Sequence, residues 1–193
     1  HIANGNATAY FDRELRFGPG HATFVHGMEL PVISAGATGD TIAVAGLAKR
    51  YRLTLHGDSI IFPRGKYVID ADVEFPAGRS VVLLQGARLF IGAGRSITVK
   101  GDLFIRGTMR NPVFIRPLKE DAPFGTVAVV GGTSQRCAIS GLYVSGGAGA
   151  KLAGIEYGGM VTVRGAALTR IESSVFQENT AEASLVVDGG ELE

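Results

Sequence analysis

The sequence predicts an all-β fold of the solenoid class, and three observations lead to that prediction. Glycine accounts for 28 of the 193 residues, about twice its average share in proteins. Val and Ile together outnumber Leu, which favours strands over helices. Short apolar runs follow one another along the chain and are separated by glycines. Runs of about three to five residues suit strands and are too short for helices.

The N-terminal third differs from the rest of the chain. Residues 1–57 hold all four histidines and lack the closely spaced glycines. We expect them to form a β-rich cap or lead-in domain, because a solenoid needs its open end covered. Residues 58–193 are expected to form the solenoid itself. The next segment alternates apolar with polar residues, which predicts one strand from Tyr67 to Phe75 with three carboxylates facing solvent: Asp70, Asp72 and Glu74.

Glycines divide the following region into strands and corners. Residues 77–80 and 93–96 both read Ala-Gly-Arg-Ser, so the unit repeats as a short strand with its corner. Sequence signals for two-residue hairpin turns, such as Asn-Gly and Asp-Gly, are scarce, which argues against antiparallel pairing of consecutive strands. The span from Gly78 to Gly101 suits one coil of three strands, about 23 residues, and residues 58–193 would make about six coils. Corners are expected at glycines 78, 86, 94, 101 and 107, and strands at 81–84, 89–91, 97–99, 103–105, 113–115, 127–130, 142–144, 161–163, 175–176 and 185–187.

Three stretches resemble a known superfamily. They are FPAGRSVVLLQGARL at 75–89, ITVKGDLFIRGT at 97–108 and Asn-Pro-Val-Phe-Ile at 111–115. They are similar to right-handed parallel β-helix domains of the pectate-lyase-like superfamily, above all those of exported bacterial surface proteins. The resemblance implies a right-handed parallel β-helix and an extracellular, cell-surface or periplasmic location. The superfamily includes polysaccharide lyases, hydrolases and epimerases, and also binding or spacer domains without activity.

Composition excludes several classes of protein. The only cysteine is Cys137, so an internal disulfide and a zinc site built on two or more cysteines are excluded. No stretch reaches the roughly 20 apolar residues of a membrane-spanning helix. The chain opens on His1 and ends in the middle of a strand pattern, so we expect it to be part of a longer protein, truncated at the C-terminus. No motif calls for a cofactor or a metal.

Four motifs that could form a catalytic or binding site are more simply interpreted as structural features. Gly57-Asp58-Ser59 resembles the nucleophile block of GDSL-type esterases, but no histidine follows His56 to serve as the base; we expect a β-turn there. His21 and His26 lie five residues apart, which on a strand places them on opposite faces and argues against a shared metal. The carboxylates at 70, 72 and 74 could hold Ca²⁺, but we expect a solvated face. The glycine-rich run at 146–150 is expected to be a corner.

Charge is distributed unevenly. Residues 79–119 hold eight basic residues and a single acid, Asp102. On two neighbouring coils these charges would form a basic belt that attracts polyanions. Nucleic acid is not expected as a partner, because the three phenylalanines of this region lie in apolar runs and base stacking needs exposed aromatic rings. The predicted ligand-binding residues are Arg79, Arg88, Arg95, Lys100, Arg106 and Arg110.

These observations predict a non-catalytic scaffold and binding module of a larger bacterial protein. It would recognise an anionic polysaccharide or a partner protein through an outer face. The alternative is a polysaccharide lyase, hydrolase or epimerase that acts on an acidic glycan, with catalytic coils beyond residue 193. End-to-end self-association through open coil edges is a further expectation.

Overall fold

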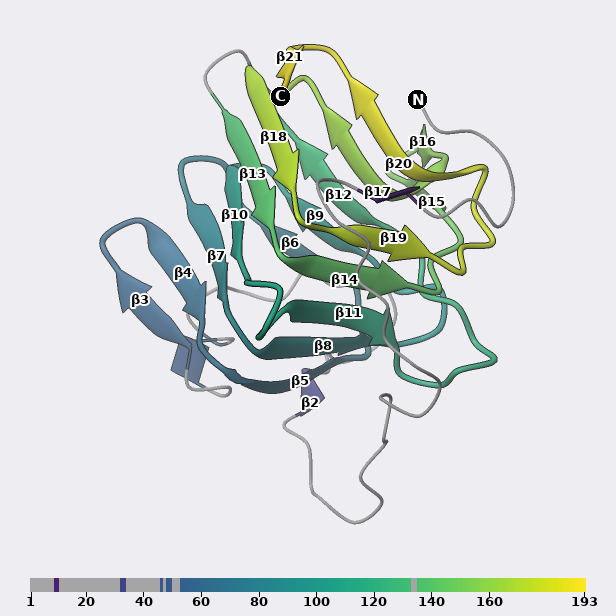
Figure 1. Ribbon diagram of the computed structural model, residues 1–193, viewed down its shortest axis with the longest axis horizontal. Coiled ribbons are helices and arrows are strands. Elements are labelled where there is room, and N and C mark those ends of the chain that lie inside the picture. Colours follow the sequence, from purple (N-terminus) through teal and green to yellow (C-terminus); the bar gives the residue numbers. More distant parts are fainter. Residues whose placement is uncertain (1–8, 11–31, 34–45, 47, 50–52, 133–134) are drawn as a thin grey trace.

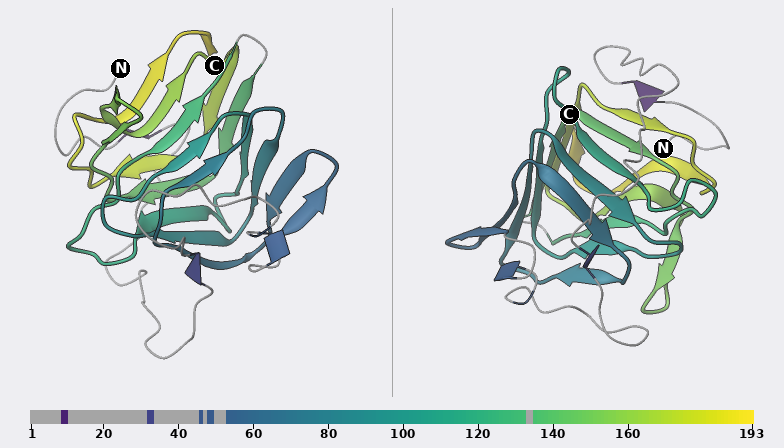
Figure 2. Two further views of the ribbon diagram at one scale, coloured as in Figure 1. Left: turned by 180° about the vertical axis from the view of Figure 1, so that it is seen from behind. Right: turned by 90° about the horizontal axis from the view of Figure 1, so that it is seen from below.

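The protein is described by a computed structural model, which covers residues 9–10, 32–33, 46, 48–49, 53–132 and 135–193. The prediction of an all-β fold is confirmed, since strands in three main sheets form the body of the protein (Figures 1 and 2). From Ser59 onward, residues paired between neighbouring parallel strands lie 21 to 34 positions apart in the sequence. Sequence-distant contacts therefore hold the fold together.

We number the sheets in the order in which the chain visits them from Thr54 onward. Sheet I contains β3 (Thr54–His56), β4 (Ser59–Phe62), β7 (Ser80–Leu84), β10 (Asp102–Arg106), β13 (Arg136–Ser140), β18 (Leu168–Glu172) and β21 (Glu191–Leu192). Sheet II contains β2 (Val32–Ile33), β5 (Gly65–Ile69), β8 (Ala87–Ile91), β11 (Val113–Pro117), β14 (Leu142–Ser145), β19 (Val175–Gln177) and β1 (Ala9–Tyr10). Sheet III contains β6 (Val73–Phe75), β9 (Ile97–Val99), β12 (Val127–Val130), β17 (Gly159–Arg164) and β20 (Ala183–Asp188).

The chain runs through sheets I, II and III and then returns to sheet I beside the strand it left. We call each set of three strands a circuit: β4-β5-β6, β7-β8-β9, β10-β11-β12, β13-β14-β17 and β18-β19-β20. Strands of neighbouring circuits pair in parallel, as β4, β7 and β10 do in sheet I. Antiparallel pairing occurs between β3 and β4, between β1 and β19, and in a short hairpin of β15 (Ala150–Leu152) and β16 (Ile155–Tyr157).

The circuits differ in length. Val81 pairs with Leu103, a step of 22 residues, close to the predicted 23. Leu103 pairs with Cys137, a step of 34. The longer step comes from loops at 107–112 and 118–126, because the strands themselves stay at three to five residues. The glycines predicted as corners, at 78, 86, 94, 101 and 107, all lie between strands.

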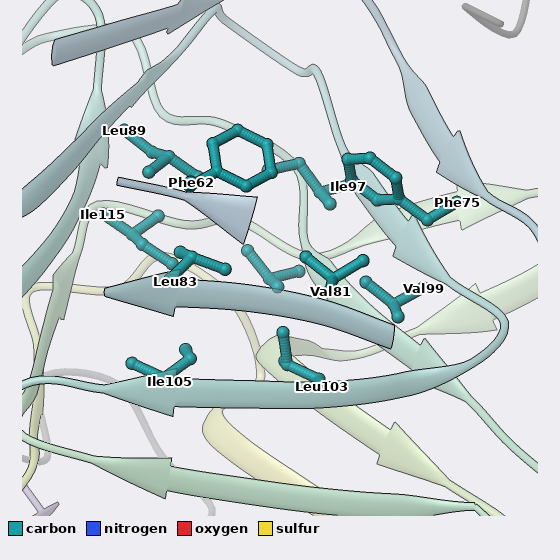
Figure 3. Close-up of a pocket in the computed structure, with 11 residues that line it drawn as sticks. Phe62, Phe75, Val81, Leu83, Leu89, Ile97, Val99, Leu103, Ile105 and Ile115 are labelled. Atoms are coloured by element: carbon teal, nitrogen blue, oxygen red, sulfur yellow. The ribbon is translucent and has the colours of Figure 1, made fainter. Parts of the chain in front are cut away.

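The interior is a column of apolar side chains enclosed by the three sheets. It is contributed by alternate residues of each strand, for example Val81 and Leu83 of β7 with Leu103 and Ile105 of β10. Phe62 and Phe75 make edge-to-face contacts, with ring centroids 6.0 Å apart (Figure 3). A cavity of about 20 Å³ remains among these side chains. Its lining is entirely apolar, so a water molecule there would find no hydrogen-bond partner.

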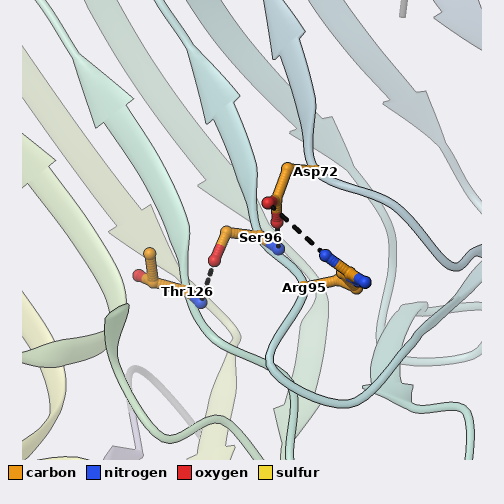
Figure 4. A network of polar contacts seen from close by, with 4 residues as sticks. All are labelled: Asp72, Arg95, Ser96 and Thr126. Carbon is orange, nitrogen blue, oxygen red and sulfur yellow. Dashed lines mark hydrogen bonds and ion pairs between the residues drawn. The ribbon is translucent and has the colours of Figure 1, made fainter. Parts of the chain in front are cut away.

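The segment from Tyr67 to Phe75 departs from its prediction. Its apolar residues are buried as expected, but the chain turns between β5 and β6 at residues 70–72, so two strands replace the predicted one. At this corner the Asp72 carboxylate accepts a hydrogen bond from the Ser96 backbone N–H at 2.9 Å, and the Ser96 hydroxyl accepts one from the Thr126 N–H at 3.1 Å (Figure 4). At this corner, side-chain oxygens thus accept the hydrogen bonds of backbone N–H groups that are not paired with a neighbouring strand.

The predicted N-terminal cap falls mostly outside the described residues, and so do His21 and His26. Three described strands fall within it: β1 and β2, which lie at opposite ends of sheet II, and β3, which lies at the edge of sheet I. Gly57 and Asp58 form the two-residue turn of the β3–β4 hairpin, with Gly57 at a φ of +55°. The β-turn predicted at this motif is therefore confirmed. Residues 146–149 of the glycine-rich run form a corner between β14 and β15, as expected, and Ala150 begins β15.

Candidate functional site

The six predicted basic residues divide into two groups according to the corner at which they lie. Arg79 and Lys100 lie between sheets III and I, and Arg95 lies between sheets II and III. Each faces a carboxylate supplied one circuit earlier. The nitrogen–oxygen distances are 4.0 Å for Arg79–Asp58, 3.8 Å for Arg95–Asp72 and 2.7 Å for Lys100–Glu74.

These three pairs link neighbouring circuits. The Arg79 guanidinium also donates a hydrogen bond to the Gly57 carbonyl at 3.2 Å. All three basic side chains are between one third and one half exposed, so each pair contributes at most about 1 kcal/mol. Because their charge is matched by a carboxylate, Arg79, Arg95 and Lys100 are poor candidates for holding an external anion.

The other three basic residues gather around the corner between sheets I and II. Arg106 ends β10, Arg110 lies in the turn that follows, and Arg88 is the second residue of β8. Arg88 and Arg106 lie over the rings of Phe114 and Phe104, at 5.6 and 5.7 Å from the centroids. In the described part of the chain, no ion pair joins any of these three arginines to a carboxylate.

A cavity of about 210 Å³ opens at this corner. Its lining comes from three successive circuits: Arg64, Gly65 and Lys66 from the first, Gly86 and Arg88 from the second, and Asn111 from the third. Lys66 and Arg88 are register partners on the parallel strands β5 and β8, so their side chains leave the same face of sheet II, about 4.8 Å apart at the backbone. We call this cavity the corner pocket.

Glycine at position 86 makes the corner pocket possible. Gly86 has a φ of +77°, and a Cβ atom there would lie 2.8 Å from the Asn111 side-chain oxygen and 3.1 Å from Cγ of Arg64. The missing side chain thus lets Arg64 and Asn111 lie side by side. Asn111 is held in its turn by hydrogen bonds from its N–H to the Thr108 hydroxyl and carbonyl, both at 3.1 Å.

Two further hydrogen bonds fix the backbone next to the corner pocket. The Tyr67 hydroxyl donates a hydrogen bond to the Pro63 carbonyl at 2.9 Å, which holds the chain just before Arg64. Burial raises the pKa of Tyr67 above its ordinary value, so its hydroxyl keeps the proton that it donates to Pro63. The Gly86 N–H donates to the Pro112 carbonyl at 3.2 Å and joins the second circuit to the third.

The corner pocket concentrates positive charge. Arg64, Lys66 and Arg88 bring three cations to one opening, and among the described residues none of them is ion-paired with a carboxylate. Like charges on register-paired positions repel each other. An anion placed among them would relieve that repulsion and would be attracted from a distance.

Arg64, Lys66 and Asn111 were not predicted as site residues. Charge summed over continuous segments does not reveal the two basic residues, because positions 64 and 66 fall before the basic stretch that begins at Arg79. The signal that could have found them is the circuit length, because Lys66 and Arg88 are 22 residues apart, the same step that joins Val81 to Leu103.

The carboxylates considered for a cation site are used within the protein. Asp72 accepts from the Ser96 backbone and pairs with Arg95, and Glu74 pairs with Lys100. The break between β5 and β6 also removes the single strand that was to align them with Asp70. Within the described ranges, no group of three His, Cys, Asp or Glu side chains is arranged to hold a metal ion.

Cys137 lies in the core, and burial raises its thiol pKa from 9.0 to about 12. The unfolded chain releases this proton around the ordinary pKa of 9.0, so the folded state holds more protons above that pH. The stabilisation is complete below about pH 9 and is lost as the pH rises toward 12, by about 1.4 kcal/mol per pH unit. We therefore expect urea unfolding between pH 8 and 10.5 to show a steeper loss of stability for the wild type than for Cys137→Ala.

Subtracting the two pH profiles cancels the titration of tyrosine and lysine, which the proteins share. Parallel profiles would mean that the thiol ionises equally in both states. As an independent check, Cys137 should react with an alkylating reagent in urea and resist it in buffer, because the thiolate is the reactive form.

Comparison with known proteins finds no match for this chain among protein-family models, curated proteins or solved structures. A helix long and apolar enough to cross a membrane is not found in the described part of the chain.

Proposed function

We propose that the protein is a non-catalytic surface or envelope scaffold of a larger bacterial protein and that it binds an anionic polysaccharide at the corner between sheets I and II. In this proposal the three-sheet stack is a right-handed parallel β-helix, and the protein is exported to the cell surface, the periplasm or the extracellular space. A partner protein with an acidic surface is the competing ligand.

The strand order supports the proposed fold. Each strand pairs in parallel with the strand one circuit away, and the chain passes to a new sheet at every corner. That arrangement suits a rod whose coils rise by one strand spacing, about 4.8 Å. A rod of this kind presents side chains from successive coils in straight rows, which suits a long, repetitive ligand.

The observation that carries the proposed function is the corner pocket, where Arg64, Lys66 and Arg88 face one opening without a carboxylate from the described residues. Elsewhere on the first two circuits, Arg79, Arg95 and Lys100 are each matched by an acid. On these two circuits, the basic residues at two corners are paired with acids and those at the third corner are available. Arg106 and Arg110 lie on the next circuit of the same corner and extend the basic surface along the rod.

We expect a variant with Arg64, Lys66 and Arg88 all replaced by Gln to bind an acidic polysaccharide at least about 10-fold more weakly than the wild type. A charge-assisted hydrogen bond is worth about 1.5–3 kcal/mol, so the loss of two such contacts suffices. The measurement is retention on immobilised acidic polysaccharide as a function of salt, since contacts of this kind weaken as salt screens them.

The matched control replaces Arg79, Arg95 and Lys100 by Gln. It removes the same net charge from the same two circuits but touches only residues paired with carboxylates, so retention should stay near that of the wild type. Equal losses in both variants would show that net charge alone attracts the polymer and would contradict the proposal. Retention that is absent, or independent of salt, in the wild type would also overturn it.

A further inference from the structure

The corner pocket differs from a generally basic surface in the way its donors are arranged. Arg64 and Lys66 approach from the first circuit, Arg88 from the second and the Asn111 side chain from the third. Neighbouring circuits are about 4.8 Å apart, so these groups surround the opening over a length of roughly 10 Å. A ligand group that satisfies all of them needs acceptor atoms pointing in several directions.

From this arrangement we infer that the corner pocket binds a tetrahedral oxyanion, the sulfate or phosphate ester group of a polymer, in preference to a carboxylate. The inference rests on the proposed function, since it names the charged group of the same ligand. A sulfate or phosphate ester carries three terminal oxygens on different sides of the central atom. A carboxylate offers two oxygens in one plane, which suits a single guanidinium in a bidentate pair.

The charge of a phosphate ester and the number of acceptor oxygens on either ester also favour these groups over a carboxylate. Three cations share the pocket, and no carboxylate of the described residues is ion-paired with them. A carboxylate brings one negative charge. A phosphate ester brings between 1.5 and 2 at neutral pH, roughly, and a sulfate ester spreads one charge over three oxygens that can each accept a hydrogen bond.

The size of the pocket allows an ester group to enter together with part of its carrier. The volume of about 210 Å³ is several times the roughly 30 Å³ that one water molecule occupies in the liquid. Arg64 and Arg88 are exposed at the opening, whereas Lys66 and Asn111 are half-buried. A group attached to a polymer can therefore reach the inner donors while its chain remains outside.

The test compares polymers with one backbone and different charged groups. Dextran sulfate, phosphorylated dextran and carboxymethyl-dextran, matched for charge per sugar, are titrated into the full chain at fixed salt. We expect at least one of the two esters to bind 10-fold or more tightly than carboxymethyl-dextran. A pH series separates the two sources, because tightening between pH 5 and 7 is expected for the phosphate ester, whose second pKa is about 6, and not for the sulfate ester.

Two alanine variants connect the preference to the corner pocket. Gly86→Ala places a methyl group against Asn111 and Arg64 without changing any charge, and we expect it to abolish the preference for esters. Gly78→Ala is the matched control, because Gly78 has nearly the same φ, +76° against +77°, and open space around its Cβ position. Circular dichroism and a urea unfolding curve for each variant test whether both proteins are folded under the binding conditions.

The possible failures can be told apart. If carboxymethyl-dextran binds as tightly as the esters and the Arg64, Lys66 and Arg88 variant still loses binding, the inference is wrong and the proposed function stands. If Gly86→Ala and Gly78→Ala keep the same preference for esters, the pocket does not select the group and the inference is again wrong. If no dextran derivative binds in a salt-dependent way, the proposed function itself fails.

Discussion

Replacing Gly101 by alanine is expected to destabilise the protein by about 3 kcal/mol or more, the upper end of what overpacking costs. Gly101 lies at the corner between β9 and β10, against the same corner of the preceding circuit. A Cβ atom there would lie 1.8 Å from the Arg79 carbonyl oxygen, 2.9 Å from its carbonyl carbon and 3.2 Å from its nitrogen. All three are backbone atoms, so rotating a side chain cannot relieve the overlap. The two circuits would have to separate and lose the parallel pairing of β7 with β10.

The free energy of unfolding in urea measures this effect. The control is Gly132→Ala, where a Cβ atom meets nothing within 4 Å and the φ is not positive. Alanine there is expected to leave stability unchanged or to raise it by about 0.4–1 kcal/mol, because it restricts the unfolded chain. Equal stabilities for the two variants would show that the corners are not in close contact.

The second large effect is expected at Phe62, where alanine should cost about 3–5 kcal/mol. The Phe62 side chain is 1% exposed. Its ring makes edge-to-face contacts with Tyr67 and Phe75, at centroid distances of 5.1 and 6.0 Å, and such aromatic pairs add to the gain from burial. The ring also borders the apolar cavity of about 20 Å³ (Figure 3), so its removal enlarges an existing void.

Urea unfolding monitored by circular dichroism measures the change in the free energy of unfolding caused by Phe62→Ala. Met109→Ala provides a comparison, since the Met109 side chain is 39% exposed at the corner between sheets I and II, and we expect it to change stability by less than about 0.5 kcal/mol. A cost below 1 kcal/mol for Phe62→Ala would mean that the first circuit is not packed on the common core.

Much of the fold could be predicted because local patterns carry it. The runs at 97–99 and 127–130 are strands over those residues, β9 and β12. Apolar residues bounded by glycines have one stable arrangement open to them, short strands that bury alternate side chains. Among the strands that were not predicted are β13 and β18, whose sequences are Arg-Cys-Ala-Ile-Ser and Leu-Thr-Arg-Ile-Glu. Polar residues interrupt their apolar positions, and in β18 the polar residue Thr169 is itself buried.

Hairpins were harder to recognise than strands. The β3–β4 turn uses Gly57-Asp58, and the β15–β16 turn uses Ala153 and Gly154, both at positive φ. Asp188-Gly189, in contrast, carries a hairpin signal but connects β20 of sheet III to β21 of sheet I. A turn signal specifies a local change of direction. The strand that the next segment joins depends on which edge is open to it.

At the candidate site, sequence patterns and tertiary structure contribute different information. Sequence patterns located most strands of the circuits, the glycine corners, the buried faces and the excess of basic residues between 79 and 119. Which of those charges are matched by carboxylates, and which are available, depends on how the circuits stack. Arg95 and Arg88 look alike in the sequence, yet Arg95 faces Asp72 while Arg88 lines the corner pocket with Lys66 and Arg64.

The register of the parallel strands explains why the matched and the available charges cannot be told apart in the sequence. Hydrogen bonds between parallel strands align residues that are 22 positions apart in one circuit and 34 in another, because loops of different length separate strands of similar length. Charge summed over continuous segments of the sequence does not show which charged residues this alignment places side by side. The corner pocket exists where Gly86 leaves room for Arg64 and Asn111 to meet beside Lys66 and Arg88, and only the folding of three circuits against one another brings those residues together.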